Sequence, residues 1–255
     1  MTQDLFRTDA YAAECTATVT AITDQGIVLD RTVFYPLGGG QAGDAGALVL
    51  ADGRELPIAD TRKGKDAEGR FTGDICHIPS SDAQGSPSIL DLSQGFGLRV
   101  GDAVTGRIDW ARRHRLMRLH TTTHLLCHLV PQLVNGCSIT PDYARLDFAM
   151  TDALDKDALT AGIAALVAAA HPVTVGRITD DELDANPALV KSMSVQPPRG
   201  SGTIRTIRIG ETELIDLQPC GGTHVANTSE IGAVVVTKIE KKSATTRRVV
   251  LGFAA

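Results

Sequence analysis

The chain has 255 residues, of which 43% are hydrophobic, 22% charged and 4% aromatic, a composition typical of a globular protein with one large domain or two small ones. Thirty acidic and 25 basic residues give a formal charge of −5, which argues against a strongly basic protein that coats nucleic acid. Five irregularly spaced cysteines, and the lack of any apolar run near the roughly 18 residues of a membrane span, predict a cytoplasmic protein with no membrane partner.

Short stretches typical of β-strands fill the first 110 residues. They cover residues 16–22, 27–35, 47–50, 56–58, 71–78 and 103–110. No window sustains a helical apolar period, so we predict a small β-barrel domain over residues 1–110. Residues 79–97 are rich in Ser, Gly, Pro and Asp; we interpret them as a surface loop of this barrel, with a domain linker as the alternative.

The pattern changes after Trp110. Residues 112–130 contain no helix breaker before Pro131 and predict a helix of about five turns. Two further helices are expected over residues 155–170 and 180–190. Strands are expected over residues 145–150, 173–179, 203–209, 212–217, 231–239 and 246–253. Strands with two or three packed helices predict an α+β domain over residues 111–255, so the fold class of the chain is α+β.

The predicted long helix contains the motif His120-Thr-Thr-Thr-His124. Residues four apart lie on one face of a helix, one turn from each other, so both imidazoles can reach one metal ion. Thr121 stands where zinc metalloproteases carry a glutamate as general base, which argues against a protease of that class. His128 continues the spacing, but it lies two turns from His120 and we expect a packing or solvent role for it.

A second pair of ligands is expected in the motif Cys220-Gly-Gly-Thr-His224, directly after a predicted strand. Two glycines permit a tight turn, so the thiolate and the imidazole can bind one ion. With His120 and His124 the set offers one sulfur and three nitrogens, which suits one tetrahedral Zn²⁺ per chain. Four protein ligands describe a closed structural site, whereas a catalytic site requires one ligand to yield or a fifth position for substrate.

The two ligand motifs in this order resemble the editing domain of alanyl-tRNA synthetase and its free-standing relatives, the AlaX proteins. The segment FYPLGGGQ at residues 34–41 is similar to the glycine motif of the longer AlaX types. The segment RLDF at residues 145–148 resembles the Arg-Phe-Asp-Phe strand of the family, and SEIG at 229–232 resembles another of its segments. The resemblance runs from about Leu29 to the C-terminus.

This resemblance implies a small β-barrel followed by an α+β editing domain with a zinc site. It also implies trans-editing, the hydrolysis of the ester that joins a wrong amino acid to the tRNA for alanine. Serine is the chief wrong amino acid in the family, and glycine is one in some members. By motif match, the zinc ligands are His120, His124, Cys220 and His224.

Residues with roles toward the substrate are expected around these ligands. Thr123 falls where the family has a hydroxyl residue near the amino-acid pocket, and its hydroxyl can hydrogen-bond a serine. Backbone N–H groups at Gly221-Gly222, or at Gly38–Gly40, are candidate oxyanion donors. Further substrate contacts are expected at Gly38, Ser138, Arg145 and Asp147. The segment 135–138 lacks the Gln that many members carry there, a departure that bears on substrate preference.

Basic residues gather at the start of the predicted long helix, at Arg112, Arg113, Arg115 and Arg118. A run of charges is usually a solvated face of a helix. Beside an aminoacyl-tRNA site, however, we expect these arginines to make salt-sensitive contacts with tRNA phosphates.

Two other functions stay open. An editing hydrolase of the threonyl-tRNA type has a similar zinc arrangement, and a non-catalytic, zinc-stabilised RNA-binding module would also explain the ligand set. The glycine motif and the Cys-Gly-Gly-Thr-His form favour the alanine branch. Barrel and editing domain fill the chain and leave no room for an ATP-binding aminoacylation core. The sequence gives no indication of the oligomeric state.

Overall fold

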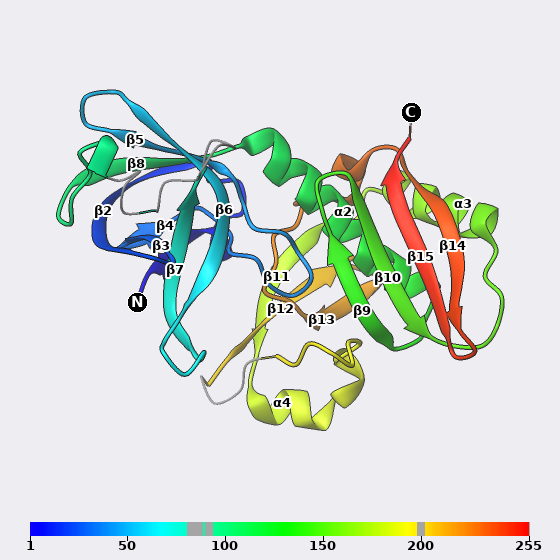
Figure 1. Ribbon diagram of the computed structural model, residues 1–255. Helices are drawn as coiled ribbons and strands as arrows, with labels where there is room; N and C mark the ends of the chain where they lie inside the picture. Colours follow the sequence, from blue (N-terminus) through cyan, green and yellow to red (C-terminus); the bar gives the residue numbers. More distant parts are fainter. Residues whose placement is uncertain (81–88, 90–93, 198–201, 255) are drawn as a thin grey trace. The chain divides into compact units, whose positions relative to one another are not determined.

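The computed structural model describes residues 1–80, 89, 94–197 and 202–254. The described part is rich in strands with few helices, which confirms the predicted α+β class (Figure 1). The chain forms two compact units. Unit 1 comprises Met1–Gly38 and Ala42–Arg113, and unit 2 comprises Gly39–Gln41 and His114–Ala255. Three residues of the glycine motif thus group with the second half of the chain.

Six strands of unit 1 form a closed barrel in the order β2-β3-β7-β6-β5-β8, with every pair of neighbours antiparallel. Their bounds are β2 (Glu14–Thr23), β3 (Gly26–Leu29), β5 (Gly46–Leu50), β6 (Glu55–Lys65), β7 (Phe71–Pro79) and β8 (Ala103–Ile108). A short parallel pair, β1 (Gln3–Asp4) and β4 (Arg31–Thr32), accompanies the 3-10 turn η1 (Leu5–Arg7). Most of the expected loop over 79–97 lies outside the described residues.

A buried ion pair within unit 1 fixes the glycine motif to the start of helix α2 (Trp110–Leu129). Arg113 is 0% exposed and its guanidinium donates to both carboxylate oxygens of Asp44, which is 1% exposed. The same guanidinium donates to the carbonyls of Ala10 and Val33, and the carboxylate also accepts the N–H of Tyr35. Because both charged groups are buried, loss of either partner would leave a costly unpaired charge in the core.

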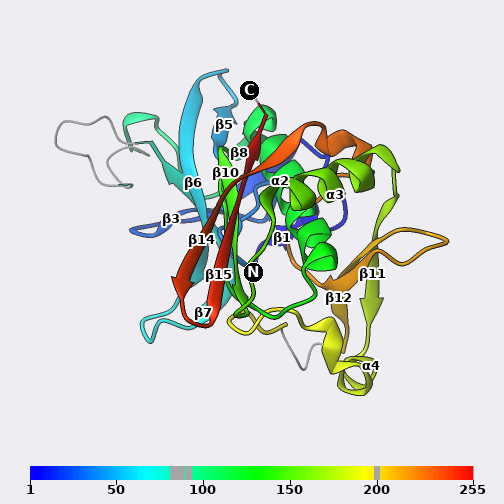
Figure 2. The ribbon, with the colours of Figure 1, turned by 90° about the vertical axis from the view of Figure 1, so that its right-hand side faces the viewer.

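Unit 2 contains two antiparallel sheets, in the orders β14-β15-β10-β9 and β11-β12-β13. Their bounds are β9 (Val134–Ile139), β10 (Tyr143–Ala149), β11 (Val173–Ile178), β12 (Ile204–Ile209), β13 (Asp216–Pro219), β14 (Val234–Ser243) and β15 (Thr246–Phe253). Two further helices are α3 (Lys156–Ala168) and α4 (Asp180–Ala185), and two 3-10 turns are η2 (Pro187–Leu189) and η3 (Thr228–Ile231). Helices α2 and α3 lie on one face of the four-stranded sheet (Figure 2).

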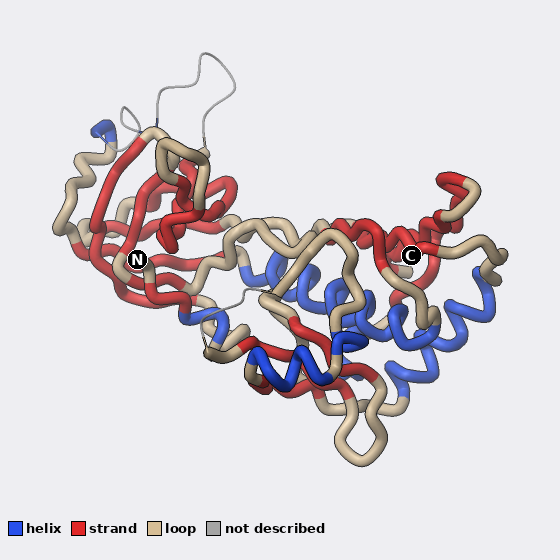
Figure 3. The backbone as a smooth tube through the Cα atoms, turned by 90° about the horizontal axis from the view of Figure 1, so that it is seen from below, coloured by secondary structure: helices blue, strands red, loops and turns tan. Residues whose placement is uncertain are grey.

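Helix α2 confirms the predicted helix over 112–130 and lies between the two sheets of unit 2 (Figure 3). From Leu116 to Cys127 every residue except Arg118 is buried, polar and apolar alike. A surface helix buries one stripe, whereas a helix between two layers is buried all round. The hydroxyls of Thr121, Thr122 and Thr123 donate to backbone carbonyls of the preceding turn, so they need no other partner in the core.

Two predicted strands begin later than the sequence indicates. Residues 211–213 form a bend closed by the hydrogen bond from Ile215 N to Ile209 O, and β13 begins only at Asp216. The segment after η3 turns at Gly232, whose φ of 64° interrupts the extended backbone before β14. Strand β9 was not predicted, because Asn135-Gly136 is typical of a turn. Within the described ranges, no helix is long and apolar enough to cross a membrane.

The histidine of β7, His77, is fully buried in unit 1. Its Nδ1 lies 2.9 Å from the carbonyl oxygen of Ile27, and its Nε2 lies 2.8 Å from the hydroxyl of Thr32. That hydroxyl oxygen already accepts the N–H of Phe34, so its proton can be donated to Nε2. A neutral ring with its proton on Nδ1 therefore satisfies both contacts. Burial lowers the pKa of His77 to about 4, against the smaller opposing effect of the Ile27 hydrogen bond.

We expect the protein to lose stability as the pH falls from about 6.5 toward 4, because in this range the unfolded chain binds a proton at His77 and the folded barrel does not. The pKa difference corresponds to about 3 kcal/mol of unfolding free energy once both steps are complete. His77→Gln should flatten this pH dependence in urea titrations followed by the fluorescence of Trp110, which packs on the barrel core. The exposed His128→Gln is the control, and equal slopes in both variants would contradict this role for His77.

Candidate metal centre

Four side chains from two distant segments converge within unit 2. His120 and His124 come from α2, and Cys220 and His224 come from the loop that follows β13. Their ligating atoms all lie within 4.8 Å of one another, so the group could hold a metal ion. The structure thus brings together all four residues that the sequence singles out as ligands. His128 is exposed and stands outside the group.

The spacing of the ligating atoms suits a tetrahedral ion. The Sγ atom of Cys220 lies 3.3 Å from Nε2 of His224 and 3.5 Å from Nε2 of His120. With Zn–S near 2.3 Å and Zn–N near 2.0–2.1 Å, a tetrahedron places a sulfur and a nitrogen ligand about 3.6 Å apart. One thiolate and three imidazoles are also a donor set that Zn²⁺ takes in proteins. The residues present therefore fit this ion in spacing and in chemistry.

Each imidazole of the cluster has a second partner at Nδ1, which leaves Nε2 for an ion. The pairs, with the distance from Nδ1 to the partner oxygen, are His120–Gln41 (2.7 Å), His124–Asp216 (2.8 Å) and His224–Thr121 (3.1 Å). Hydrogen bonds of this kind fix the tautomer and the orientation of a ligating ring. The cluster is therefore arranged for ligation beyond the four ligands themselves.

Gln41 ties the glycine motif to the ligand loop. Its side chain is fully buried. Its Oε1 accepts from Nδ1 of His120 and from the N–H of Thr223 at 3.1 Å, and its Nε2 donates to the Thr223 hydroxyl at 2.9 Å. Gln41 also bridges to Ile139 in parallel, and the N–H of Ile139 donates to the carbonyl of Gly40 at 2.8 Å. Backbone pairing with the end of β9 thus fixes the position of Gln41, and the side-chain amide of Gln41 in turn orients His120.

The ligand loop accepts only glycine at position 222. A Cβ there would lie 2.1 Å from Cε1 of His120 and 2.8 Å from Oε1 of Gln41. The N–H of Gly222 donates to Sγ of Cys220 at 3.4 Å, a contact that favours the thiolate. Arg205 on β12 donates to the carbonyls of Cys220 and Gly222 at 2.6 and 3.0 Å. The loop is therefore fixed at the backbone on both sides of its turn.

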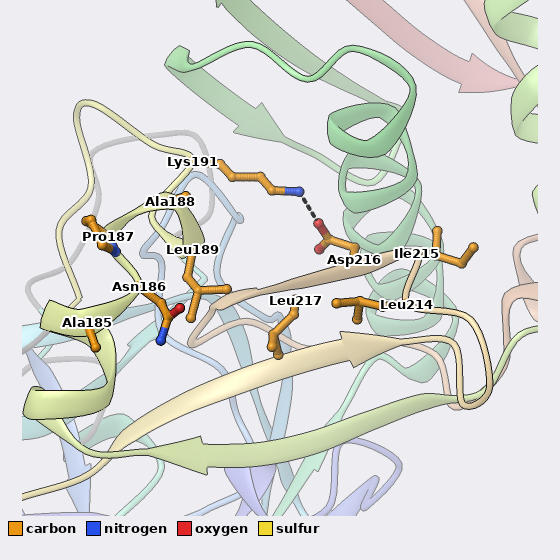
Figure 4. A pocket seen from close by; sticks show the side chains of 10 residues that line it. All are labelled: Ala185, Asn186, Pro187, Ala188, Leu189, Lys191, Leu214, Ile215, Asp216 and Leu217. Atoms are coloured by element: carbon orange, nitrogen blue, oxygen red, sulfur yellow. Dashed lines mark hydrogen bonds and ion pairs between the residues drawn. The ribbon is translucent and has the colours of Figure 1, made fainter.

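Asp216 contacts the cluster and also lines a cavity. One carboxylate oxygen accepts from Nδ1 of His124, and the other pairs with the ammonium of Lys191 (Figure 4). Lys191 and Asp216 both border a cavity of about 400 Å³, whose other walls are residues 185–189 and 214–217. Burial raises the pKa of the Asp216 carboxyl, but His124 and, to a smaller extent, Lys191 lower it to about 2, so this carboxyl stays ionised.

The electrostatics of the cluster favour the ligating forms of its side chains. Burial would raise the pKa of the Cys220 thiol, but the imidazoles of His120 and His224 lower it well below its usual range. Burial and the neighbouring His120 ring lower the pKa of His224. Burial lowers the pKa of His124, but Asp216 and the Cys220 thiolate outweigh it and raise the value to about 9. A cation that binds here therefore displaces a proton from His124.

The three residues with predicted catalytic roles have well-defined surroundings. Thr123 is 4% exposed, and its hydroxyl donates to the carbonyl of His120 at 2.7 Å. Gly39 and Gly40 have φ angles of 59° and 87°, a left-handed backbone that favours glycine at both positions. A Cβ at Gly40 would also lie 2.9 Å from Sγ of Cys137. The catalytic roles of these three residues stay predictions.

Ser138, Arg145 and Asp147 lie on the face of the four-stranded sheet that points away from α2. The alternating residues of β10 that are buried on the α2 side are Ala144, Leu146 and Phe148. Arg145 and Asp147 therefore project from the opposite face, and Ser138 lies directly across from Arg145. Asp147 pairs with Arg145 at 3.0 Å, and its two carboxylate oxygens accept from Nε and Nη2 of Arg248. The structure does not bring these predicted substrate residues together with the ligand cluster.

The arginines at the start of α2 differ from one another in role. Arg113 is fully buried in its ion pair with Asp44, so the predicted phosphate contact at this residue is wrong: contact would require breaking a buried pair. The other three are half-exposed and donate to backbone carbonyls; they are Arg112 to Gly43, Arg115 to Pro141 and Arg118 to Ile231. Arg115 and Arg118 also lie over the ring of Phe253, at 4.2 and 4.4 Å. For these three the predicted phosphate contact stays a prediction.

The residues that orient the ligands were not predicted from the sequence. These residues are Gln41, Thr121 and Asp216, which belong to no spacing typical of metal ligands. Their role is seen only in the structure, where each contacts Nδ1 of one ligand histidine. For two of the three, the sequence does hold a signal. Gln41 is the last residue of the glycine motif, and Asp216 is the acidic residue of the segment that leads to Cys220.

Two family models match the sequence. Residues 204–250 match the threonyl and alanyl tRNA synthetase second additional domain, a region that runs from β12 to β15 and includes Cys220 and His224. Residues 7–77 match the class II (A) tRNA synthetases.

Relatives cover nearly the whole chain. The alanyl-tRNA editing protein AlaX-M of Methanosarcina barkeri is 36% identical over 97% of this chain and 97% of its own length. AlaX-M of Saccharolobus solfataricus is 33% identical over 98% of each chain. The alanine–tRNA ligase of Metallosphaera sedula is 33% identical over 94% of this chain, which corresponds to 25% of the ligase. The similarity thus extends across both units and both ligand motifs.

We expect Gln41→Leu to weaken Zn²⁺ binding by about 10- to 100-fold. His120 loses the acceptor that fixes its tautomer, and Thr223 loses the two hydrogen bonds that it makes with the Gln41 side chain. Competition with a chromophoric chelator measures the affinity. Gln132→Leu, at an exposed position of unit 2, is the matched control. If the two variants bind Zn²⁺ equally well, Gln41 does not position the ligand.

Proposed function

Because the chain belongs to the AlaX-M family of alanyl-tRNA editing proteins, we propose that it hydrolyses the ester bond of mischarged tRNA for alanine. The seryl ester is the first substrate and the glycyl ester the second. The observation that carries this proposal is the cluster of His120, His124, Cys220 and His224, in a chain similar to AlaX-M proteins over nearly its whole length.

The cluster holds one Zn²⁺ per chain in this proposal. Support comes from the S–N spacings of 3.3 and 3.5 Å and from the oxygen partner at each Nδ1. When bound, Zn²⁺ supplies a positive charge that holds the amino or ribose group of the substrate beside the ester. The three histidines are only 4–5% exposed, whereas Cys220 is half-buried and Gly221 exposed. Substrate therefore approaches from the side of the ligand loop.

The protein must stabilise the negative charge that develops on the ester oxygen. An aminoacyl ester is already activated, so hydrolysis needs chiefly a positioned water and hydrogen-bond donors for this oxygen. The N–H of Gly222 is committed to Sγ of Cys220, which removes it from the candidate donors. Gly39 and Gly40 are the donors that we favour, because the bond from Ile139 to the Gly40 carbonyl fixes the direction of this loop.

Contacts with the body of the tRNA are assigned to half-exposed arginines. In unit 2 these are Arg115, Arg118 and Arg145, and in unit 1 Arg112. Asp147 holds the Arg145 side chain in place, and Ser138 stands beside it as a hydrogen-bond partner for ribose or phosphate. Such contacts position the nucleic acid without reading its sequence.

We expect the purified protein to deacylate Ser-tRNA for alanine faster than Ala-tRNA for alanine. Cys220→Ala should lower the rate more than about 100-fold. Loss of a residue that only hydrogen-bonds a metal ligand typically costs up to about 100-fold, and loss of the ligand itself should cost more. Cys15→Ala, in unit 1, is the matched control and should retain the wild-type rate. The assay measures release of labelled serine, and the metal content of each variant is determined alongside it.

The same assay separates the other candidate functions. Hydrolysis of Ser-tRNA for threonine in place of Ser-tRNA for alanine would assign the threonyl-type activity. Binding of tRNA with no hydrolysis of any ester, in protein that contains zinc, would assign a non-catalytic RNA-binding module. Either result would refute alanyl-tRNA editing.

Thr123→Val should lose discrimination between seryl and alanyl esters by about 1–3 kcal/mol of transition-state free energy. The Thr123 hydroxyl donates to His120 O but keeps lone pairs that can accept the proton of a serine hydroxyl. The ratio of kcat/KM for Ser-tRNA and Ala-tRNA measures the effect. Thr122→Val is the matched control, because this buried hydroxyl donates to the carbonyl of Arg118 in the same way. A ratio unchanged from that of the control would rule out Thr123 as the residue that recognises serine.

A further inference from the structure

Two lysines and an exposed aromatic ring gather on the hairpin of β6 and β7 in unit 1. Lys65 is paired across the hairpin with Phe71, whose side chain is 64% exposed. The ammonium of Lys63 lies 5.2 Å from the centre of the Phe71 ring, and that of Lys65 lies 5.6 Å from it. In Figure 1 this hairpin is the cyan pair of long strands. We call Lys63, Lys65 and Phe71 the hairpin surface.

The two lysines lack the acidic partners that other bases of unit 1 have. Among the residues that the structure describes, the arginines of this unit that pair with an Asp or Glu are Arg7, Arg31, Arg54, Arg62, Arg70, Arg107 and Arg113. Within the same described ranges, neither Lys63 nor Lys65 has an ion pair. This is notable because the first 100 residues carry 14 acidic and only 8 basic residues. Positive charge is thus left uncompensated at one place in an acidic half of the chain.

The surroundings of Lys63 disfavour its positive charge. Its Nζ lies 3.3 Å from the position of a Cβ at Gly38, so the ammonium stands directly against the first glycine of the glycine motif. Burial and the like charge of Arg7 lower the pKa of Lys63. A cation held beside a second cation and a backbone loop is stabilised by an anion that binds from outside.

We infer that the hairpin surface binds single-stranded RNA, with a base stacked on Phe71 and the neighbouring phosphates held by Lys63 and Lys65. Exposed aromatic rings flanked by cations are the means by which proteins hold single strands without reading their sequence. A base that stacks on the ring replaces one ammonium there, and that ammonium moves to the adjacent phosphate. This inference rests on the proposed function, and it assigns the unpaired 3′ end of tRNA a contact in unit 1.

The chemistry of the surface favours RNA over an acidic protein partner. Carboxylates of a protein could neutralise the lysines, but they would not require the ring to be exposed. A duplex could also meet the lysines, yet its bases are already stacked and cannot use Phe71. Dependence on both the charges and the ring therefore distinguishes a single strand from either alternative.

The test measures binding of a fluorescent single-stranded RNA that ends in CCA, and of a duplex of the same length, by fluorescence anisotropy at several salt concentrations. Lys63→Gln with Lys65→Gln should weaken single-strand binding about tenfold at moderate salt and reduce the salt slope by about 1.4. Phe71→Leu should weaken single-strand binding about fivefold or more and leave duplex binding unchanged.

The matched control removes the same charge from the other end of the barrel strand. Arg54→Gln with Arg107→Gln also changes the net charge of unit 1 by two. Arg54 precedes Glu55 in the sequence and Arg107 pairs with Glu55, which is the first residue of β6, whereas Lys65 is the last residue of this strand. This control should bind RNA as the wild type does. Equal weakening in the lysine variant and the control would overturn the inference, because net charge alone would then explain it. Unchanged single-strand binding by Phe71→Leu would overturn it as well.

Failure of this inference can be told apart from failure of the proposed function. If the wild type hydrolyses Ser-tRNA and the lysine variant binds single-stranded RNA as the control does, the hairpin surface is refuted and editing stands. If the hairpin variants lose RNA binding as expected but the wild type hydrolyses no ester, the surface stands and editing is refuted.

Discussion

The structure of unit 2 depends on one constraint at the ligand cluster: three buried imidazoles must direct their Nε2 atoms to the same point. An imidazole can do so only while its Nδ1–H has an acceptor, because an unpaired buried N–H is costly and leaves the ring free to turn. The acceptors are oxygens of Gln41, Thr121 and Asp216, which belong to a loop, a helix and a strand. The ligand geometry therefore exists only when all three segments are in place.

The same constraint explains the burial of α2. One side of the helix packs apolar residues such as Leu119 and Leu126 in the core, while the side with His120 and His124 meets β13 and the ligand loop. Polar residues between the layers are tolerated because their hydroxyls donate to the carbonyls of the helix itself. Packing and ligation are thus supplied by one stretch of sequence, and the burial that stabilises the unit also desolvates the ligands.

The sequence allowed the ligands to be predicted, because their spacing lies within one helix and one short loop. The acceptors could not be found in this way: Gln41 is 79 residues from His120, and Asp216 is 92 residues from His124. The same limit explains the error at Arg113, since a run of arginines does not indicate which one faces Asp44, 69 residues away. Strand β9 was missed because pairing with β10 outweighs the turn preference of Asn135-Gly136.

Residues 39–41 group with unit 2, although the chain on either side of them groups with unit 1. A gene fragment that begins at His114 would encode all four ligating side chains, yet it would lack the acceptor of His120 and the backbone partner of Ile139. The segments that truncation or recombination can exchange are therefore not the compact units of the fold. Such a fragment would therefore encode the four ligands but not every acceptor that orients them.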